Sequence, residues 1–490
     1  MPRCGHVPVA YRQVQPRQAT MMKTCIICSG PAGTHEHIFP AVLGGRRTNK
    51  GIYCGKHNQQ LGPHAKVLSD QMRAINALLG VHPDHADGPT CLIAKNPVDG
   101  QDYAVTGQKI ENVQPHILGD ATLPDGSRGV KAAFSSEQQL QNWLAAQRAS
   151  GAQVHVAGPR TEGFTVFAEP YSVRLVLGGP DGLRAIAYVA LTFFAHHFPD
   201  IARQSCLRTF KDYVLGATEA QQPIWWDFDP PSVDLPAQQF RFGHRVVIGL
   251  STSRQEAYAR VSFFSTLDFS AILGSVSVEQ DKTVVIDIDP LAKRPPRDIH
   301  EARSDAALAG VTRPASLTAG LANDIQQGGT EARFRTLLDG ISSWQLDQAV
   351  DALLPQVNAA RSLNAPMRQQ RIRELLTDQQ QRVFNHISYA VKEFKTRLLA
   401  DRATAAFAPS LDSLIASDPT SPTGITAIAS SALELGLGAL TAHICQLLDA
   451  RELDLLQLRS LLGEGNGAAI AARPTLECWV EKLVACVMAR

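Results

Sequence analysis

Residues 25–58 read CIICSGPAGTHEHIFPAVLGGRRTNKGIYCGKHN and carry the most specific chemistry in the chain. Cys25-x-x-Cys28 lies at the start of this stretch and Cys54-x-x-His57 at its end, so each tight turn offers two metal ligands. Three thiolates and one imidazole form the ligand set of a closed, tetrahedral zinc site. The segment is poor in apolar residues, and a bound metal would supply folding free energy that hydrophobic burial cannot. We therefore predict a structural zinc ion held by these four residues.

The residues between the two turns follow a recognisable order. An acidic-His-apolar-apolar-Pro string is followed by a Gly-Gly turn, a central Asn and a closing Asn: Glu36 to Pro40, Gly44-Gly45, Asn49 and Asn58. This stretch resembles the HNH (ββα-metal) endonuclease family, in its zinc-ribbon variety. The resemblance covers about 45 of the 490 residues, and more loosely the body resembles the large C-terminal region of some stand-alone HNH proteins.

The resemblance implies roles for individual residues in phosphodiester hydrolysis. His37, on the first strand of a β-hairpin, would be the general base, a task that suits an imidazole near neutral pH. Asn58, on the first turn of the following helix, would hold a catalytic divalent metal together with Glu36. Oxygen ligands of this kind suit Mg²⁺ or Mn²⁺. Asn49 would brace the loop that positions His37.

The charge distribution favours a polyanionic partner for the same module. The whole chain has 47 Lys and Arg residues against 46 Asp and Glu residues, for a formal net charge of +1. Residues 23–66 nevertheless contain Glu36 as their only acidic residue. We expect DNA backbone phosphates to be bound by four basic residues of the module, which makes binding salt-dependent rather than sequence-specific. These residues are Arg46, Arg47, Lys50 and Lys56.

Several alternatives stay open at the level of the sequence. His57 could serve the catalytic metal instead, which would leave the three cysteines with another zinc ligand such as His35. The module could be a non-catalytic zinc ribbon that binds nucleic acid, or an RNase, since an HNH site recognises phosphate geometry. A small nuclease joined to a large body also suits an anti-phage defence effector with a regulatory body, by analogy of architecture alone.

The length of 490 residues and the changes of composition along the chain predict an α+β protein with several domains. We predict a small N-terminal zinc-stabilised ββα-metal domain, a central mixed α/β domain and a C-terminal helical domain. Their boundaries are a flexible tail at 1–21, the nuclease domain at 22–81, a linker at 82–100, a regulatory or targeting domain at 101–295 and the helical domain at 296–490.

Hydrophobic periodicity indicates the elements of the body. Strands are expected at 103–105, 154–157, 164–167, 171–177, 245–250, 257–264 and 283–288. Helices are expected at 57–79, 136–150, 183–197 and 201–214, followed by helices broken at 328–329, 366, 419–424 and 463–467. The Trp- and Pro-rich stretch 223–236 is expected to be a loop.

Residues 425–448 are apolar for about the length that spans a bilayer, but Glu434 lies in the middle and no basic cluster flanks either end. We predict a buried helix there, a cytoplasmic protein without a membrane partner, and a possible homo-oligomer or defence-system partner. The nine cysteines are an odd number, which argues against a fully paired disulfide framework.

Overall fold

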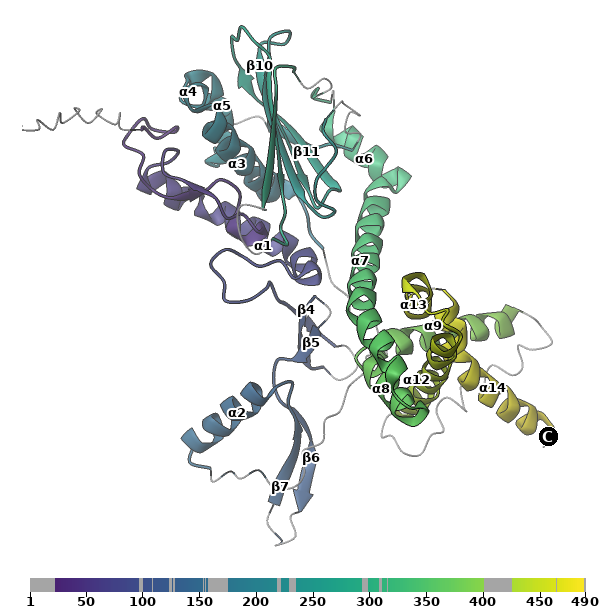
Figure 1. Cartoon of the computed structure of the whole chain (residues 1–490). Helices are drawn as coiled ribbons and strands as arrows, with labels where there is room; N and C mark the ends of the chain where they lie inside the picture. The colour runs from purple at the N-terminus through teal and green to yellow at the C-terminus, as the bar shows by residue number, and fades with distance from the viewer. Residues whose placement is uncertain are drawn as a thin grey trace, which may run out of the picture. The chain divides into compact units, whose positions relative to one another are not determined.

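The computed structural model describes residues 23–488, except 97–99, 108, 123–125, 127, 153, 155, 157–174, 218–221, 229–234, 293–297, 308–310, 315, 401–424 and 464. The fold is α+β, as the sequence predicts (Figure 1). Contacts divide the chain into two compact units. Unit 1 comprises Met1–Asn76, Gly80–Thr90 and Leu175–Glu331, and unit 2 comprises Ala77–Leu79, Cys91–Arg174 and Ala332–Arg490.

The N-terminal part of unit 1 is a β-hairpin followed by a long helix, which confirms the expected ββα order. Strand β1 (Glu36–His37) pairs with β2 (Thr48–Asn49) in antiparallel register, Glu36 opposite Asn49 and His37 opposite Thr48. A short 3-10 helix, η1 (Ala41–Leu43), lies in the connection. Helix α1 (Gly55–Leu79) begins directly after Cys54.

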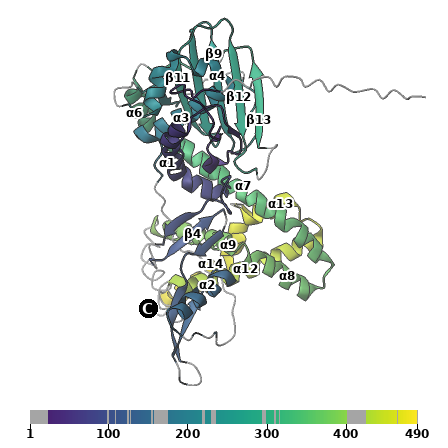
Figure 2. The same cartoon turned by 90° about the vertical axis from the view of Figure 1, so that its left-hand side faces the viewer.

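The body of unit 1 is an antiparallel sheet of six strands in the order β13-β12-β9-β10-β11-β8. The strands are β8 (Ile224–Trp226), β9 (His244–Ser251), β10 (Glu256–Phe263), β11 (Leu267–Ser275), β12 (Lys282–Ile288) and β13 (Ile299–Ser304). The remaining elements of unit 1 are α3 (Gly179–His197), α4 (Pro199–Ala202), η2 (Ser205–Leu207), α5 (Arg208–Val214) and α6 (Leu317–Gln327). Helix α3 packs against β8, β9, β10 and β11, and β13 forms one edge of the sheet (Figure 2).

Aromatic side chains join the hairpin to this body. Phe39, fully buried after β1, has its ring centroid 6.1 Å from that of Phe193 on α3 and 6.2 Å from that of Phe263 on β10. The hydroxyl groups of Tyr53 and Thr192 lie 3.0 Å apart. These contacts join the hairpin to the core of unit 1, and the separate domain at 22–81 stays a prediction.

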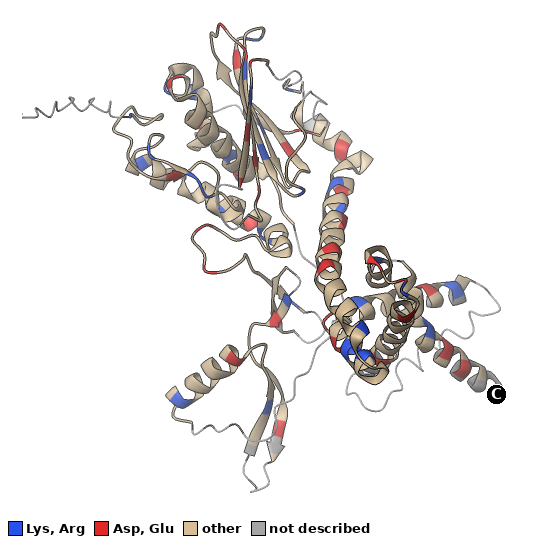
Figure 3. Ribbon diagram, in the orientation of Figure 1, with Lys and Arg blue, Asp and Glu red and all other residues tan. Residues whose placement is uncertain are grey.

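Unit 2 contains two small sheets and a set of helices. Strands β3 (Leu92–Lys95), β4 (Asp102–Thr106) and β5 (Lys109–Asn112) form one sheet, and β6 (His116–Thr122) pairs with β7 (Arg128–Ala133). The helices are α2 (Glu137–Ala149), α7 (Gly329–Ala359), η3 (Ala360–Ser362), α8 (Ala365–Thr377), α9 (Gln380–Ala400), α12 (Ile425–Ala450), α13 (Leu455–Leu462) and α14 (Asn466–Met488). Leu and Ile side chains of the C-terminal helices form one hydrophobic core. Along α7, the basic residues Arg333 and Arg335 lie near the N-terminal end, and the charged residues that follow are all acidic (Figure 3).

Most expected elements that fall on described residues are confirmed, including the strands at 103–105, 245–250, 257–264 and 283–288 and the helices at 57–79, 136–150 and 183–197. The expected strands at 154–157, 164–167 and 171–177 and the break at 419–424 lie largely or wholly outside the described residues. The breaks at 328–329, 366 and 463–467 fall at or within a residue or two of helix ends.

Four expectations about elements are wrong. The stretch 223–236 contains strand β8, whose residues pair with β11. The helix expected at 201–214 is interrupted, because Ser205–Leu207 form a 3-10 turn before α5. The expected linker 82–100 contains β3, and the expected helical region from 296 begins with β13. The partner of β8 lies more than 40 residues further along the chain, and local propensity does not report such a pairing.

The apolar stretch at 425–448 forms helix α12, as expected. Among the described residues, no helix combines the length and the apolar character that crossing a membrane requires.

Candidate metal centre and adjoining catalytic groups

Cys25, Cys28, Cys54 and His57 meet at one point of unit 1, with their ligand atoms all within 4.8 Å of one another. His57 Nδ1 lies 3.6 Å from Cys25 Sγ and 3.2 Å from Cys54 Sγ, and Cys28 Sγ lies 3.8 Å from Cys54 Sγ. Around a tetrahedral zinc ion, neighbouring sulfur and nitrogen ligands are about 3.5 to 3.8 Å apart. These four residues can therefore bind a metal such as zinc.

Backbone hydrogen bonds shape the two turns that present these ligands. Cys25 N–H donates to the Gly30 carbonyl at 2.7 Å, and Ser29, with φ 59°, donates back to the Cys25 carbonyl at 3.0 Å. Ile26 N–H donates to the Ile52 carbonyl at 3.0 Å, which ties the first turn to the second. His35, the alternative ligand, is exposed with its Nδ1 3.4 Å from Thr48 Oγ1 and is not a member of the cluster.

The electrostatic setting of two of these ligands favours their metal-binding forms. The backbone N–H of His57 lowers the pKa of the Cys54 thiol, because it stabilises the thiolate at the start of α1. Burial lowers the pKa of His57, assisted by the charge of Lys56, and so favours the neutral imidazole. Metals bind the thiolate and the neutral imidazole.

Glu36 and Asn58 come together on one side of the hairpin. Burial raises the pKa of Glu36 to about 7, and a hydrogen bond from the Asn58 side chain partly opposes this shift. Tyr188 of α3 donates its O–H to Glu36 Oε1. Asn58 Oδ1 is buried, and no donor among the described residues reaches it. A desolvated carboxylate beside an unpaired amide oxygen is a donor set that fits a hard divalent cation.

His37 has a different set of neighbours from Glu36. Its Nε2 lies 3.1 Å from Asp84 Oδ2, and its ring centroid lies 5.0 Å from that of His85. Burial raises the pKa of Asp84, but the hydrogen bond with His37 and the nearby charges of His37, His85 and Arg46 outweigh it and hold this pKa below its ordinary value. Successive side chains of a strand point to opposite faces. The structure accordingly unites Glu36 with Asn58 but does not place His37 in contact with either.

Asn49 supports the hairpin without touching His37 in the described contacts. Its Oδ1 accepts from the backbone N–H of Gly51 at 2.8 Å, and its Nδ2 lies 2.8 Å from Nδ1 of His196 on α3. Arg203 donates to the carbonyls of Thr24 and Gly51, each at 3.1 Å. These contacts tie the start of the module and the turn after β2 to His196 of α3 and to Arg203.

The four basic residues expected at phosphates differ in their surroundings. Arg46 is a correction: its side chain is 9% exposed, and its guanidinium donates to the carbonyls of Ala292 and His82 and to Asp84 Oδ1, so these donors are already used inside the protein. Arg47 is 43% exposed and lies 3.8 Å from the buried Asp298. Lys50 and Lys56 are exposed.

Sequence reasoning missed Asp84 and Tyr188 as parts of this site and assigned His85 to the linker. Asp84 and His85 lie in the turn-rich stretch 82–90, and an acidic residue directly before a histidine was the only local feature that could have predicted a metal or catalytic site there. Tyr188 lies in an apolar helix that reads as core, and no local signal marks it.

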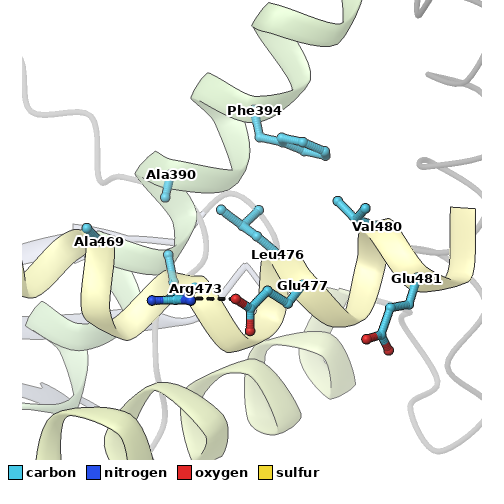
Figure 4. A pocket seen from close by; sticks show the side chains of 9 residues that line it. Ala390, Phe394, Ala469, Arg473, Leu476, Glu477, Val480 and Glu481 are labelled. Atoms are coloured by element: carbon cyan, nitrogen blue, oxygen red, sulfur yellow. Dashed lines mark hydrogen bonds and ion pairs between the residues drawn. The ribbon is translucent and has the colours of Figure 1, made fainter. Parts of the chain in front are cut away.

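Neither of two further hollows contains a comparable set of chemical groups. In unit 2, a cavity of about 650 Å³ lies between α9 and α14, where Phe394, Leu476 and Val480 meet an Arg473–Glu477 ion pair (Figure 4). In unit 1, a cavity of about 140 Å³ lies beside two ion-paired arginines, Arg245 and Arg260.

No known protein family, curated protein or solved structure matches this chain.

Proposed function

We propose that the N-terminal module is a metal-dependent endonuclease of the HNH type that hydrolyses phosphodiester bonds in DNA. The observation that carries this proposal is the pair formed by Glu36 and Asn58, a desolvated carboxylate beside a buried amide oxygen without a donor among the described residues. His37 follows Glu36 on the same strand, and its hydrogen bond with Asp84 supports the proposal.

The proposed chemistry divides between the two faces of β1. Glu36 and Asn58 would hold Mg²⁺ or Mn²⁺, which when bound supplies positive charge to the phosphate and to the leaving oxygen. His37 accepts the proton of the attacking water, and Asp84 holds the imidazole in one tautomer and orientation. In-line displacement places the attacking and leaving oxygens on opposite sides of phosphorus, so the proposal requires the scissile phosphate to lie where His37 reaches one of these oxygens and the metal reaches the other.

The exposed basic residues and the Cys-His metal cluster have the remaining proposed roles. Lys50 and Lys56, and Arg47 with its partly exposed side chain, would contact backbone phosphates. Zinc at Cys25, Cys28, Cys54 and His57 would hold the turn that starts α1, and with it the position of Asn58. Regulation by the body and a role in anti-phage defence stay predictions.

Plasmid cleavage tests the proposal. The full chain is incubated with supercoiled plasmid and Mg²⁺ or Mn²⁺, beside His37→Ala, Asn58→Ala and the control His35→Ala, which removes an exposed histidine of the same hairpin. We expect His35→Ala to cut like the unaltered chain and the other two variants to lose about 100-fold or more in rate. Equal nicking by all four proteins would contradict the proposal.

Parallel substrates separate the alternatives. Cleavage of single- and double-stranded RNA but not of plasmid would assign the site to an RNase. Salt-sensitive DNA binding that His37→Ala leaves unchanged, with no cleavage in either metal, would indicate a non-catalytic zinc-ribbon binding module.

A further inference from the structure

A second cluster of metal-binding side chains lies beside the hairpin, in unit 1. His37, Asp84 and His85 each offer one ligand atom, and these atoms all lie within 4.8 Å of one another. Asp84 Oδ2 lies 3.1 Å from His37 Nε2 and 3.8 Å from His85 Nε2. The three residues are distinct from the zinc-type cluster and from Glu36 and Asn58.

Arg46 prepares the carboxylate of Asp84 for this role. Its Nη1 donates to Asp84 Oδ1 at 3.3 Å, while its Nε and Nη2 are fixed by the carbonyls of Ala292 at 3.0 Å and His82 at 3.1 Å. One carboxylate oxygen is thus held by an immobilised guanidinium, and the other faces the two imidazoles. A ligand whose other atom is held in this way loses little conformational entropy on binding a metal.

The distances suit a first-row transition ion. At metal–ligand bonds of about 2.1 Å, adjacent ligand atoms lie about 3.0 to 3.5 Å apart. The separation of Asp84 and His37 already falls in this range. His85 is 76% exposed, so its side chain can close the remaining few tenths of an ångström. The exposed side of the cluster leaves coordination positions for water.

We propose that His37, Asp84 and His85 form a site for a borderline divalent transition ion, such as Ni²⁺, Co²⁺ or Zn²⁺. Two imidazoles and one carboxylate favour these ions over Mg²⁺ and Ca²⁺, which prefer oxygen ligands. The inference does not rest on the proposed nuclease activity. It bears on that activity because a metal at His37 Nε2 would replace the hydrogen bond through which Asp84 orients the imidazole.

Metal titration of the full, untagged chain without nucleic acid tests the inference. The protein is first loaded with one equivalent of Zn²⁺, which the thiolate cluster takes, and is then titrated with Co²⁺ by calorimetry and visible absorption. We expect one further equivalent, with the weak bands of nitrogen and oxygen ligation and without thiolate charge-transfer bands. His85→Ala should weaken this binding by at least about tenfold, while His35→Ala leaves it unchanged.

Two results would overturn the inference: the absence of a further Co²⁺ equivalent, or equal binding by the unaltered chain and His85→Ala. Equal losses in His85→Ala and His35→Ala would also overturn it, since they would indicate scattered surface histidines. Because His85 is exposed, circular dichroism of this variant should match the unaltered chain. Failure of DNA cleavage has no effect on the titration, so the two proposals fail separately.

Discussion

The imidazole of His244 is fully buried among phenylalanine rings. Its ring centroid lies 5.0 Å from that of Phe39, 5.5 Å from that of Phe263 and 4.6 Å from that of Phe264. Burial lowers the pKa of His244 to about 3, opposed in part by a hydrogen bond with the Leu43 carbonyl. The residue therefore stays neutral in the folded protein throughout the ordinary pH range.

This shift predicts acid sensitivity of unit 1. The folded pKa of His244 is below the unfolded value of about 6.5, so between those values only the unfolded chain binds the proton, and the free energy of unfolding falls as pH falls through this window. Between pH 6.5 and pH 4.5, the free energy of unfolding should fall by about 2 kcal/mol less in His244→Phe than in the unaltered chain. Urea unfolding at both pH values measures it, and identical pH slopes in the two proteins would refute it.

The thiolate cluster predicts a specific response to loss of one ligand. Cys54→Ser should reduce zinc from about one ion per chain to much less, because three remaining ligands hold the ion poorly. Elemental analysis after dialysis measures the content, and a chelator should lower the melting temperature of the unaltered chain but not of the variant. Cys206→Ser, a free and partly exposed thiol outside the cluster, is the control and should keep its zinc.

The proposed activity predicts that Asp84 acts as a positioning residue. Asp84→Asn should lower kcat by about 10- to 100-fold with little change in KM, because the imidazole of His37 loses its orienting carboxylate. The pH profile of kcat should also move, which a purely structural loss would not produce. Asp87→Asn, three residues away and exposed, should behave like the unaltered chain. A change in KM alone would speak against the positioning role.

Some residues of the site can be predicted from their neighbours in the sequence, and others cannot because their partners are distant. Cys25, Cys28, Cys54 and His57 could be predicted because paired ligands three residues apart form a metal site by backbone turns alone. Asp84 and Tyr188 could not, because the chain reaches His37 and Glu36 from 47 and 152 residues away. Arg46 was misassigned for the same reason, since its carbonyl partner Ala292 is 246 residues away.

At the scale of elements, the turn after β1 depends on a glycine. A Cβ on Gly45 would collide with the backbone carbonyl of Phe39, and backbone cannot move as a side-chain tip can. Gly45→Ala should therefore cost about 2 kcal/mol or more in the free energy of unfolding. Gly320→Ala, in α6 of the same unit with open space around its Cβ, should be neutral or stabilise by up to about 1 kcal/mol. Thermal unfolding of both variants checks the contrast, and equal losses would contradict the steric argument.

The predictability of the elements follows hydrophobic periodicity. Strands β9, β10 and β12 and helices α1, α2 and α3 show clear alternation or helical spacing, and they are where the sequence indicates them. Strand β8 has only three residues in a Trp- and Pro-rich stretch, and it becomes a strand because the edge of β11 accepts it. Such short edge strands are set by a partner rather than by propensity.

At the scale of the molecule, the sequence indicates separate domains where the structure has a unit assembled from three segments. A basic, Cys-rich N-terminus read as an independent module because its composition differs from that of the body. The deciding contacts, such as Phe39 with Phe263, join residues that no local window contains.

This assembly predicts how the chain tolerates truncation. A fragment of residues 1–90 should aggregate or bind the dye ANS, because Phe39 and Tyr53 lose the surfaces that bury them. A fragment of residues 1–331 retains every segment of unit 1 and should show a cooperative thermal transition. A sharp transition for the shorter fragment would instead show that the module folds by itself.

The separation between Phe39 and the strand that covers it also has a consequence for synthesis. Ribosomes add about 5–20 residues per second, so roughly ten to forty-five seconds pass between translation of the hairpin and translation of Phe263. Throughout that interval the nascent chain exposes aromatic side chains beside three thiols that can oxidise or be captured by the wrong metal. Early zinc binding by the emerging turns would protect those thiols. The apolar side chains of the hairpin would stay exposed and available for chaperone binding.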